Sequence, residues 1–228
     1  MKLLISVRDV AEALLASHGG ADFIDLKEPG QGALGGLPVP TIRAIVEALR
    51  RQGLGLPVSA TIGDLPMQGL TRILECVQAV GDCGLDYVKV GIESGAGASE
   101  VLDALAACGR PVVPVFIADR GLDAALLERA VALRFPALMA DTADKLAGSL
   151  FDVVPLPRLR SFVATARGQG ALVGLAGALR LQHAQALADL APDFAGFRSA
   201  VCVGERSAAL DGTCLKRLVD TMRPVQAT

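Results

Sequence analysis

The sequence predicts an α/β fold in which eight parallel strands alternate with helices and close into one barrel. Apolar segments of strand length alternate with segments of helical periodicity, at a period of roughly 25 to 30 residues. No linker interrupts the 228 residues, and this length is typical of a single-domain (β/α)8 TIM barrel, here covering residues 1–228. The rival fold, a doubly wound open sheet, would need a glycine-rich phosphate loop after the first strand. Ser6-Val7-Arg8-Asp9 contains no glycine, which favours the barrel.

The strands are predicted from short apolar runs that end at turn residues. They are expected at residues 2–6, 22–27, 57–62, 85–90, 111–117, 137–140, 171–174 and 194–197. The run at 111–117 is rich in valine and isoleucine, whose β-branched side chains favour strands. Because strands that alternate with helices pair in parallel through right-handed crossovers, all eight are expected in one sheet.

The helices are predicted from apolar residues three and four positions apart. The first begins after Asp9, a favourable N-cap residue, and ends at Gly19-Gly20. The others are expected at residues 40–51, 66–80, 99–108, 123–133, 157–167, 177–190 and 213–222. A longer loop that contains Lys145 and Gly148 precedes the helix at 157–167.

Composition excludes several classes of function. With 22 basic and 24 acidic residues, no tryptophan and one tyrosine, the chain is not expected to bind nucleic acid. No apolar stretch reaches the length of a membrane span, and the N-terminus lacks the apolar core of a signal peptide, so we expect a cytoplasmic protein without a membrane partner. Five cysteines without a C-x-x-C pair and two histidines without a third ligand predict neither a disulfide nor a metal site. No cofactor is expected.

Lysine is scarce in this sequence and unevenly placed. Five of the 22 basic residues are lysine and the other 17 are arginine. Because arginine serves wherever a plain positive charge suffices, a lysine indicates a task for an amine that can lose its proton. Lys27 and Lys89 lie at the C-terminal ends of the second and fourth predicted strands and Lys145 follows the sixth, and the inward side chains of these strands share one layer of the barrel. We therefore expect the three amines to face each other at the mouth, although any one of them alone could be a solvated surface charge.

Clustered amines indicate covalent chemistry. Burial and mutual repulsion lower the pKa of a lysine from about 10.4 toward neutrality. A neutral amine attacks an aldehyde or ketone, and the resulting imine is an electron sink for proton removal or carbon–carbon bond formation. Asp25 and Asp141 lie beside these lysines and are expected either to position an amine and shuttle protons or only to balance charge. Asp64, Glu93 and Asp119 also follow strands, and we interpret them as rim residues.

Two loops near the end of the chain are candidates for binding a substrate phosphate. Gly174-Leu175-Ala176-Gly177 follows the seventh strand, and Gly196-Phe197-Arg198-Ser199 follows the eighth. Backbone N–H groups of these two loops form the usual phosphate site of this barrel. We therefore predict phosphate contacts from Gly174, Ala176, Gly177, Arg198 and Ser199.

Several segments together resemble one enzyme family. They are residues 3–9, 20–29, 32–35, 59–64, 87–91, 141–145 and 149–152. In these segments the sequence resembles the (5-formylfuran-3-yl)methyl phosphate synthases, also called 4-(hydroxymethyl)-2-furaldehyde-phosphate synthases. The pattern D-x-K-x-P at residues 25–29 and the pattern D-T-A-x-K at 141–145 are the most specific parts. The similarity runs along nearly the whole chain and weakens from Gly204 onward.

The resemblance implies a TIM-barrel lyase that acts on carbon–oxygen bonds of phosphates. It implies condensation of two molecules of glyceraldehyde 3-phosphate, a triose phosphate, into (5-formylfuran-3-yl)methyl phosphate with loss of water and phosphate. The product would supply the furan of methanofuran-type one-carbon carriers. The resemblance also implies Lys27 as the Schiff-base lysine and Lys89 as proton acceptor, assisted by Asp25, Asp141 and Lys145.

Two other functions remain open at this point. One is another class I aldolase, which would also use a lysine imine on a phosphosugar but would release no inorganic phosphate. The other is a non-catalytic barrel that binds a phosphate. Association into a homo-oligomer through the outer helices is likewise left open.

Overall fold

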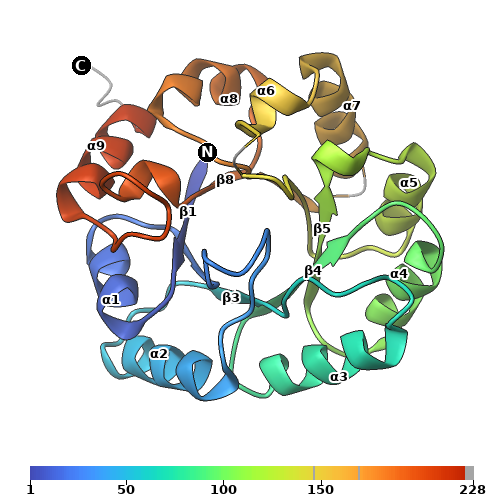
Figure 1. The fold of residues 1–228 in the computed structure, drawn as a ribbon, viewed down its shortest axis with the longest axis horizontal. Coiled ribbons are helices and arrows are strands. Elements are labelled where there is room, and N and C mark those ends of the chain that lie inside the picture. Colours follow the sequence, from blue (N-terminus) through green and yellow to red (C-terminus); the bar gives the residue numbers. More distant parts are fainter. Residues whose placement is uncertain (146, 169, 224–228) are drawn as a thin grey trace.

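The chain forms a closed barrel of eight parallel strands in a computed structural model that describes residues 1–145, 147–168 and 170–223. The strands are β1 (Lys2–Val7), β2 (Phe23–Leu26), β3 (Val58–Thr61), β4 (Tyr87–Ile92), β5 (Val112–Ile117), β6 (Ala137–Asp141), β7 (Leu172–Leu175) and β8 (Phe194–Phe197). Each strand pairs with the next along the chain, and β8 pairs with β1 to close the ring (Figure 1). The predicted (β/α)8 TIM barrel is confirmed.

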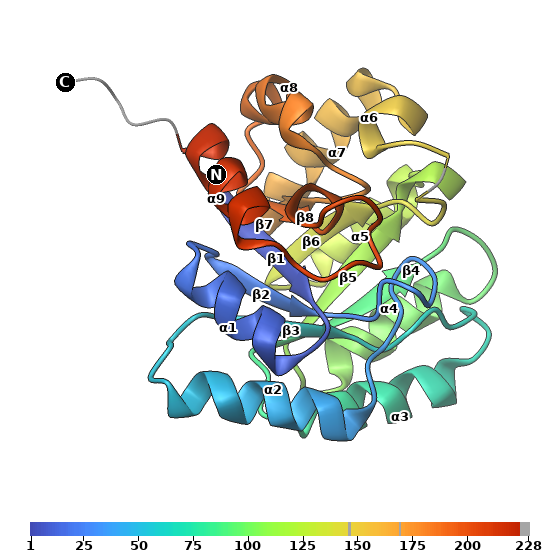
Figure 2. The ribbon, with the colours of Figure 1, turned by 60° about the vertical axis from the view of Figure 1, so that its left-hand side comes forward.

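The helices form an outer layer around this ring (Figure 1). The α-helices are α1 (Val10–His18), α2 (Val39–Arg51), α3 (Leu70–Gly81), α4 (Ala98–Ala107), α5 (Ala124–Ala132), α6 (Leu150–Val153), α7 (Leu156–Arg167), α8 (Ala184–Leu190) and α9 (Gly212–Met222). Short 3-10 turns follow three of the strands: η1 (Ala118–Arg120), η2 (Leu181–His183) and η3 (Ser199–Val201). Figure 2 shows α2 and α3 along one side of the barrel and α7 and α8 along another. Within the described residues, none of the helices is long and apolar enough to cross a bilayer.

Two helix boundaries differ from the sequence prediction for reasons of backbone geometry. The helix predicted over residues 66–80 begins only at Leu70, because a turn closed by its own backbone hydrogen bond precedes it. The helix predicted over 177–190 is shortened to η2 and α8. Gly177 and Ala178 have φ angles of 117° and 46°, which a right-handed helix does not accommodate. The backbone between β7 and η2 is therefore a loop, and part of it borders the candidate site.

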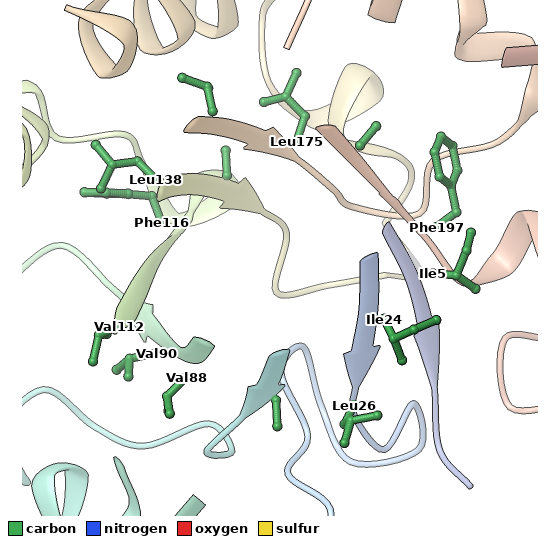
Figure 3. Close-up of a cluster of buried hydrophobic side chains, with 14 of the residues drawn as sticks. Ile5, Ile24, Leu26, Val88, Val90, Val112, Phe116, Leu138, Leu175 and Phe197 are labelled. Carbon is green, nitrogen blue, oxygen red and sulfur yellow. The ribbon is translucent and has the colours of Figure 1, made fainter. Parts of the chain in front are cut away.

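Side chains alternate between the two faces of each strand, as the strand period of two requires. The outward face packs against the helices and forms the large buried cluster to which Ile24, Val88 and Leu138 belong. Figure 3 shows these side chains pointing away from the interior of the ring. A smaller apolar cluster that includes Leu4 and Phe194 fills part of the interior. The polar residues of the interior are therefore displaced toward one end of the barrel.

Strand register decides which polar residues meet. Asp25 of β2 is paired with Ser6 of β1 and with Ser59 of β3. Asp141 is the last residue of β6, and Lys27 comes directly after the end of β2. Because all strands run in the same direction, these residues lie near the same, C-terminal end of the barrel.

Candidate active site

A small cavity lies at the C-terminal ends of the strands, and we call it the mouth cavity. The residues that line it come from the ends of β1, β2, β6, β7 and β8 and from the loops that follow them. They are Leu4, Ser6, Asp25, Lys27, Met139, Asp141, Lys145, Ala176, Gly177, Ala178, Gly196, Phe197, Arg198, Ser199 and Arg206. The long loop between β2 and α2, drawn in blue, reaches inward over this end of the ring (Figure 1).

Asp141 lies between two lysines in the mouth cavity. Its Oδ2 is 3.7 Å from Nζ of Lys27. Its Oδ1 accepts a hydrogen bond from Nζ of Lys145, which also donates to the carbonyl oxygen of Thr142. The side chains of Lys27 and Lys145 are only 8% and 7% exposed, so neither lysine is a solvated surface charge.

A second buried pair lies deeper in the barrel. Nζ of Lys89 is 2.9 Å from Oδ1 of Asp25, and both side chains are almost fully buried. Asp25 also accepts hydrogen bonds from the hydroxyl groups of Ser59 and Ser6, at 2.7 and 3.3 Å. These contacts hold the carboxylate at the level where β1, β2 and β3 pair.

Lys89 also borders a cavity below the site. This lower cavity has a volume of ≈ 210 Å³ and is lined mainly by apolar side chains, with Ser59, Tyr87 and Lys89 among its polar residues. Tyr87 and Lys89 thus share the inward face of β4, while Val88 and Val90 pack outward. Lys89 lines this lower cavity and not the mouth cavity, so the structure does not bring all three amines to the mouth as predicted. Lys89 instead reaches Asp25, which does line the mouth cavity.

Burial changes the acidity of Lys89 and Lys145. Burial lowers the pKa of Lys89 below that of a free lysine, and the adjacent Asp25 offsets only part of this effect. Burial likewise lowers the pKa of Lys145 to about 8, against the opposing charge of Asp141. The positive charge of Lys27 lowers both pKa values further. Burial is therefore a larger cause of the lowered pKa values than repulsion between the amines.

The two aspartates remain ionised. Burial would raise the pKa of each carboxyl, but the neighbouring ammonium groups outweigh it and hold both pKa values below the usual range. Lys89 and Lys27 act on Asp25, whereas Lys145 and Lys27 act on Asp141. Asp25 and Asp141 are thus charged acceptors. Each lies beside a lysine, Lys89 or Lys145, whose pKa is lower than that of a lysine in water.

Four of the five residues predicted to contact a phosphate line the mouth cavity, but Gly174 does not. Gly174 lies within β7, where a Cβ would come within 2.2 Å of the ring of Phe194. Its lack of a side chain therefore serves packing inside the barrel. Gly177 does border the cavity, and a Cβ there would lie 2.9 Å from the side chain of Thr142. This glycine permits the close approach of the loops after β6 and β7.

The Arg198 side chain is not available for a phosphate, contrary to the prediction. Its Nη1 and Nη2 donate to the carboxylate of Glu12 at 2.5 and 3.1 Å. The remaining bonds go to carbonyl oxygens of Ser6, Arg206 and Ala208, at 3.1, 2.9 and 2.6 Å. Together these bonds occupy every N–H of a guanidinium. Arg198 therefore holds α1 and the loop after β8 in place, and only its backbone remains as a candidate phosphate contact.

Arg206 lines the mouth cavity although it was not among the predicted site residues. It lies in the loop between η3 and α9, where the family resemblance is weaker. The only sequence signal for a phosphate contact there was an arginine after the eighth strand. Arg198 is also such an arginine and lies closer to the end of that strand. Ser59 was missed as well, although strand alternation places it on the same face of β3 as Thr61.

The three predicted rim carboxylates hold loops at the mouth. Asp64 accepts hydrogen bonds from the backbone N–H groups of Ala33 and Leu34. Asp119 accepts from the backbone N–H groups of residues 143 and 144. Glu93 forms an ion pair with Arg120 at 2.7 Å. Among the residues that the structure describes, no group of three or more His, Cys, Asp or Glu side chains could hold a metal ion.

The fold and this site define a (β/α)8 barrel with an amine-rich cavity at the C-terminal ends of its strands. Comparison with known proteins specifies the family. The family model for 4-HFC-P synthase matches residues 3–219. The chain therefore belongs to the 4-HFC-P synthase family.

Curated relatives agree with this assignment. A (5-formylfuran-3-yl)methyl phosphate synthase from Archaeoglobus fulgidus is 35% identical over 237 residues, which cover 97% of this chain and 99% of the relative. The enzyme of the same name from Methanothermobacter thermautotrophicus is 34% identical and is covered to 90% on both sides. A crystal structure of phosphoribosyl anthranilate isomerase from Thermus thermophilus matches with a TM-score of 0.65, 20% identity and coverage of 97% and 98%. At that identity it supports the fold alone.

Proposed function

We propose that this protein is a (5-formylfuran-3-yl)methyl phosphate synthase that condenses two molecules of glyceraldehyde 3-phosphate through a lysine imine. Two triose phosphates contain the atoms of the furan product, one inorganic phosphate and two molecules of water. The reaction thus needs no oxidant or reductant. Its demands are carbon–carbon bond formation, dehydration and departure of one phosphate, all of which a protonated imine assists by withdrawing electrons.

The observation that carries this proposal is the lack of a hydrogen-bonded partner for the Lys27 amine among the described residues. Among the described residues, none forms a hydrogen bond with Nζ of Lys27, and its ion pair with Asp141 is long, at 3.7 Å. Lys89, in contrast, forms a close ion pair with Asp25 at 2.9 Å, and Lys145 donates a hydrogen bond to Asp141. An amine that lines the mouth cavity without a hydrogen-bonded partner is the one best able to attack a substrate aldehyde.

Lys89 is proposed as the proton acceptor. Burial lowers its pKa, so the amine is closer to the acidity that a general base needs than a free lysine is. Asp25 holds the amine at 2.9 Å and stabilises the charge that forms when the proton is taken up. The apolar walls of the lower cavity maintain the burial that lowers the pKa.

Lys145 and Asp141 are proposed to act together in proton transfer to the departing groups. A lysine with a pKa of about 8 is mostly protonated at neutral pH and releases its proton readily, as a general acid must. Asp141 orients Lys145 through one oxygen and faces Lys27 through the other. The carboxylate therefore connects the imine position with the proposed acid.

The phosphate of the bound triose is proposed to lie against the loops after β7 and β8. Ala176, Gly177, Gly196 and Ser199 line that side of the mouth cavity. Backbone N–H groups in such loops are the usual phosphate ligands of this fold.

The reaction is tested by incubating the protein with glyceraldehyde 3-phosphate. We expect a near-ultraviolet absorbance from the furan aldehyde and release of one inorganic phosphate for each product molecule. A new carbon–carbon bond without furan absorbance or phosphate release would support the aldolase instead. Failure to form any product or covalent adduct would support a phosphate-binding barrel.

The imine is tested by trapping with borohydride. With glyceraldehyde 3-phosphate present, mass spectrometry of peptides should locate the reduced adduct on Lys27. Lys27→Arg keeps the positive charge but cannot form an imine, so it should remain folded and lose both adduct and turnover. Lys216→Arg is the matched control, because Lys216 lies on the surface of α9 in an ion pair with Asp220. Normal turnover by Lys27→Arg would remove Lys27 from the mechanism.

A further inference from the structure

The guanidinium of Arg206 has unused hydrogen-bonding capacity at the mouth cavity. It is half-buried and makes one long hydrogen bond, from Nη1 to the carbonyl oxygen of Gly32 at 3.5 Å. Among the described residues, no carboxylate forms an ion pair with it. Burial lowers the pKa of Arg206, because the charged form is only partly solvated. A half-buried cation with free donors is stabilised by any anion that enters beside it.

The other cations of the mouth cavity are already engaged. Lys27 and Lys145 share the carboxylate of Asp141. The side chain of Arg198 has all its donors occupied by Glu12 and backbone carbonyls. Within the described lining of this cavity, Arg206 is thus the arginine that can offer a free pair of N–H groups to a phosphate.

Arg206 is held in position by Arg198. The carbonyl oxygen of Arg206 accepts a hydrogen bond of 2.9 Å from Nε of Arg198, and Ala208 accepts another from Nη2. Cys202 and Leu210 form an antiparallel bridge at the base of the same loop. The backbone of Arg206 is therefore anchored to a buried ion pair while its side chain reaches the cavity. Such preorganisation reduces the entropy lost when a ligand binds.

A neighbouring cavity is too acidic to attract a phosphate. This cavity of ≈ 600 Å³ is lined by Asp64, Glu93, Asp119 and Asp144, and its arginine, Arg120, is paired with Glu93. The carboxylates of this cavity follow β3 to β6, whereas Arg206 follows β8 and reaches the edge of the same cavity at Gly32. A doubly charged phosphate is repelled by these carboxylates and attracted by Arg206.

We propose that Arg206 binds the phosphate group of the triose substrate. The ligand class is a phosphate monoester, and the guanidinium would exchange its long bond to Gly32 for two bonds to phosphate oxygens. This inference rests on the proposed function for the identity of the substrate. The phosphate would then lie between Arg206 and the backbone of the loops after β7 and β8.

The test compares aldehydes with and without a phosphate. Wild-type protein, Arg206→Ala and Arg206→Lys are incubated with either glyceraldehyde 3-phosphate or unphosphorylated glyceraldehyde, and the Lys27 adduct is trapped with borohydride at several concentrations. For Arg206→Ala we expect the concentration needed for half-maximal trapping to rise about 10- to 100-fold with the phosphorylated aldehyde. With glyceraldehyde it should remain at the wild-type value. Arg206→Lys should recover part of the difference, because lysine binds phosphate as a point charge.

Calorimetric titration with inorganic phosphate gives a readout that does not depend on the imine. Phosphate should bind wild-type protein and bind Arg206→Ala at least about 10-fold more weakly. Arg120→Ala is the matched control, since Arg120 lines the acidic cavity, does not line the mouth cavity and is paired with Glu93. Its phosphate affinity should equal that of the wild type.

The outcomes separate this inference from the proposed function. If Arg206→Ala traps both aldehydes as the wild type does, the assignment of Arg206 is wrong and the imine chemistry stands. If no adduct is trapped in the wild type with either aldehyde, but Arg206→Ala binds phosphate more weakly than the wild type does, the phosphate site stands and the proposed chemistry is wrong. If Arg120→Ala loses as much phosphate affinity as Arg206→Ala, the loss reflects only the net charge of the mouth, and the assignment of Arg206 is wrong.

Discussion

Replacing Glu12 by glutamine should destabilise the protein far more than replacing a carboxylate of a surface ion pair. Glu12 is 4% exposed and accepts hydrogen bonds from both Nη atoms of Arg198 and from the backbone N–H groups of Arg8 and Leu210. Glutamine removes the negative charge and turns an NH2 group toward these donors. The Arg198 guanidinium is then left buried without a counter-charge.

The expected cost follows from that burial. Removing one partner of a buried ion pair costs about 3–5 kcal/mol of unfolding free energy. For a chain of this size each kcal/mol lowers the melting temperature by about 2–4 °C, so Glu12→Gln should lower it by roughly 6 to 20 °C. Glu47→Gln is the control, because the Glu47–Arg51 pair lies at 3.7 Å with side chains 69% and 70% exposed. Such a pair contributes about 0–1 kcal/mol.

The assay is thermal and urea unfolding followed by circular dichroism at neutral and acidic pH. Burial would raise the pKa of Glu12, but Arg198 outweighs it and holds the pKa below the ordinary value. A carboxylate with a depressed pKa stabilises the fold above its unfolded pKa of about 4.3, and this contribution is lost as the pH falls through the folded value. The difference between wild type and Glu12→Gln should therefore shrink in acid. A neutral-pH difference no larger than that of Glu47→Gln would refute the reasoning.

Two further predictions concern the site. Turnover should decline as the pH rises above about 8, because Lys145 then loses the proton it is proposed to donate. In Lys145→Gln the remaining slow turnover should lack this alkaline decline, which a pH profile of kcat measures. An unchanged alkaline decline in the variant would show that another group titrates there. Gly177→Ala should lower stability by roughly 1–3 kcal/mol and raise KM, because φ is 117° and the added Cβ meets the side chain of Thr142 at 2.9 Å. Gly53→Ala, at φ 68° with open space around the added Cβ, should cost only about 1 kcal/mol, and urea titration of both variants measures the difference. Equal losses would show that the contact with Thr142 is unimportant.

The fold was predictable because its signals are local and repeated. Each strand has a run of apolar residues and each helix a spacing of three and four, and these patterns recur along the chain without a break. The boundary at Gly177 was not predictable, because its backbone conformation depends on how closely the loops after β6 and β7 approach. A pattern of apolar residues contains no information on that distance.

Part of the site was predictable for the same reason. Strand parity places Lys27 and Lys89 toward one interior, and the common direction of the strands places their ends together. The structure brings these amines to Asp141 and Asp25. Their catalytic roles remain predictions for the experiments above.

The sequence by itself determined the barrel, its strand order and the inward direction of Lys27 and Lys89, because these follow from periodicity and chain direction. Only the tertiary structure decided which arginine is free. Arg198 and Arg206 are eight residues apart in the same region after β8, yet one is enclosed by Glu12 and backbone carbonyls and the other faces the cavity. That difference arises because Glu12 of α1, 186 positions away in the chain, packs beneath the last loop. The availability of a charged group depends on such distant partners, and no pattern of nearby residues records them.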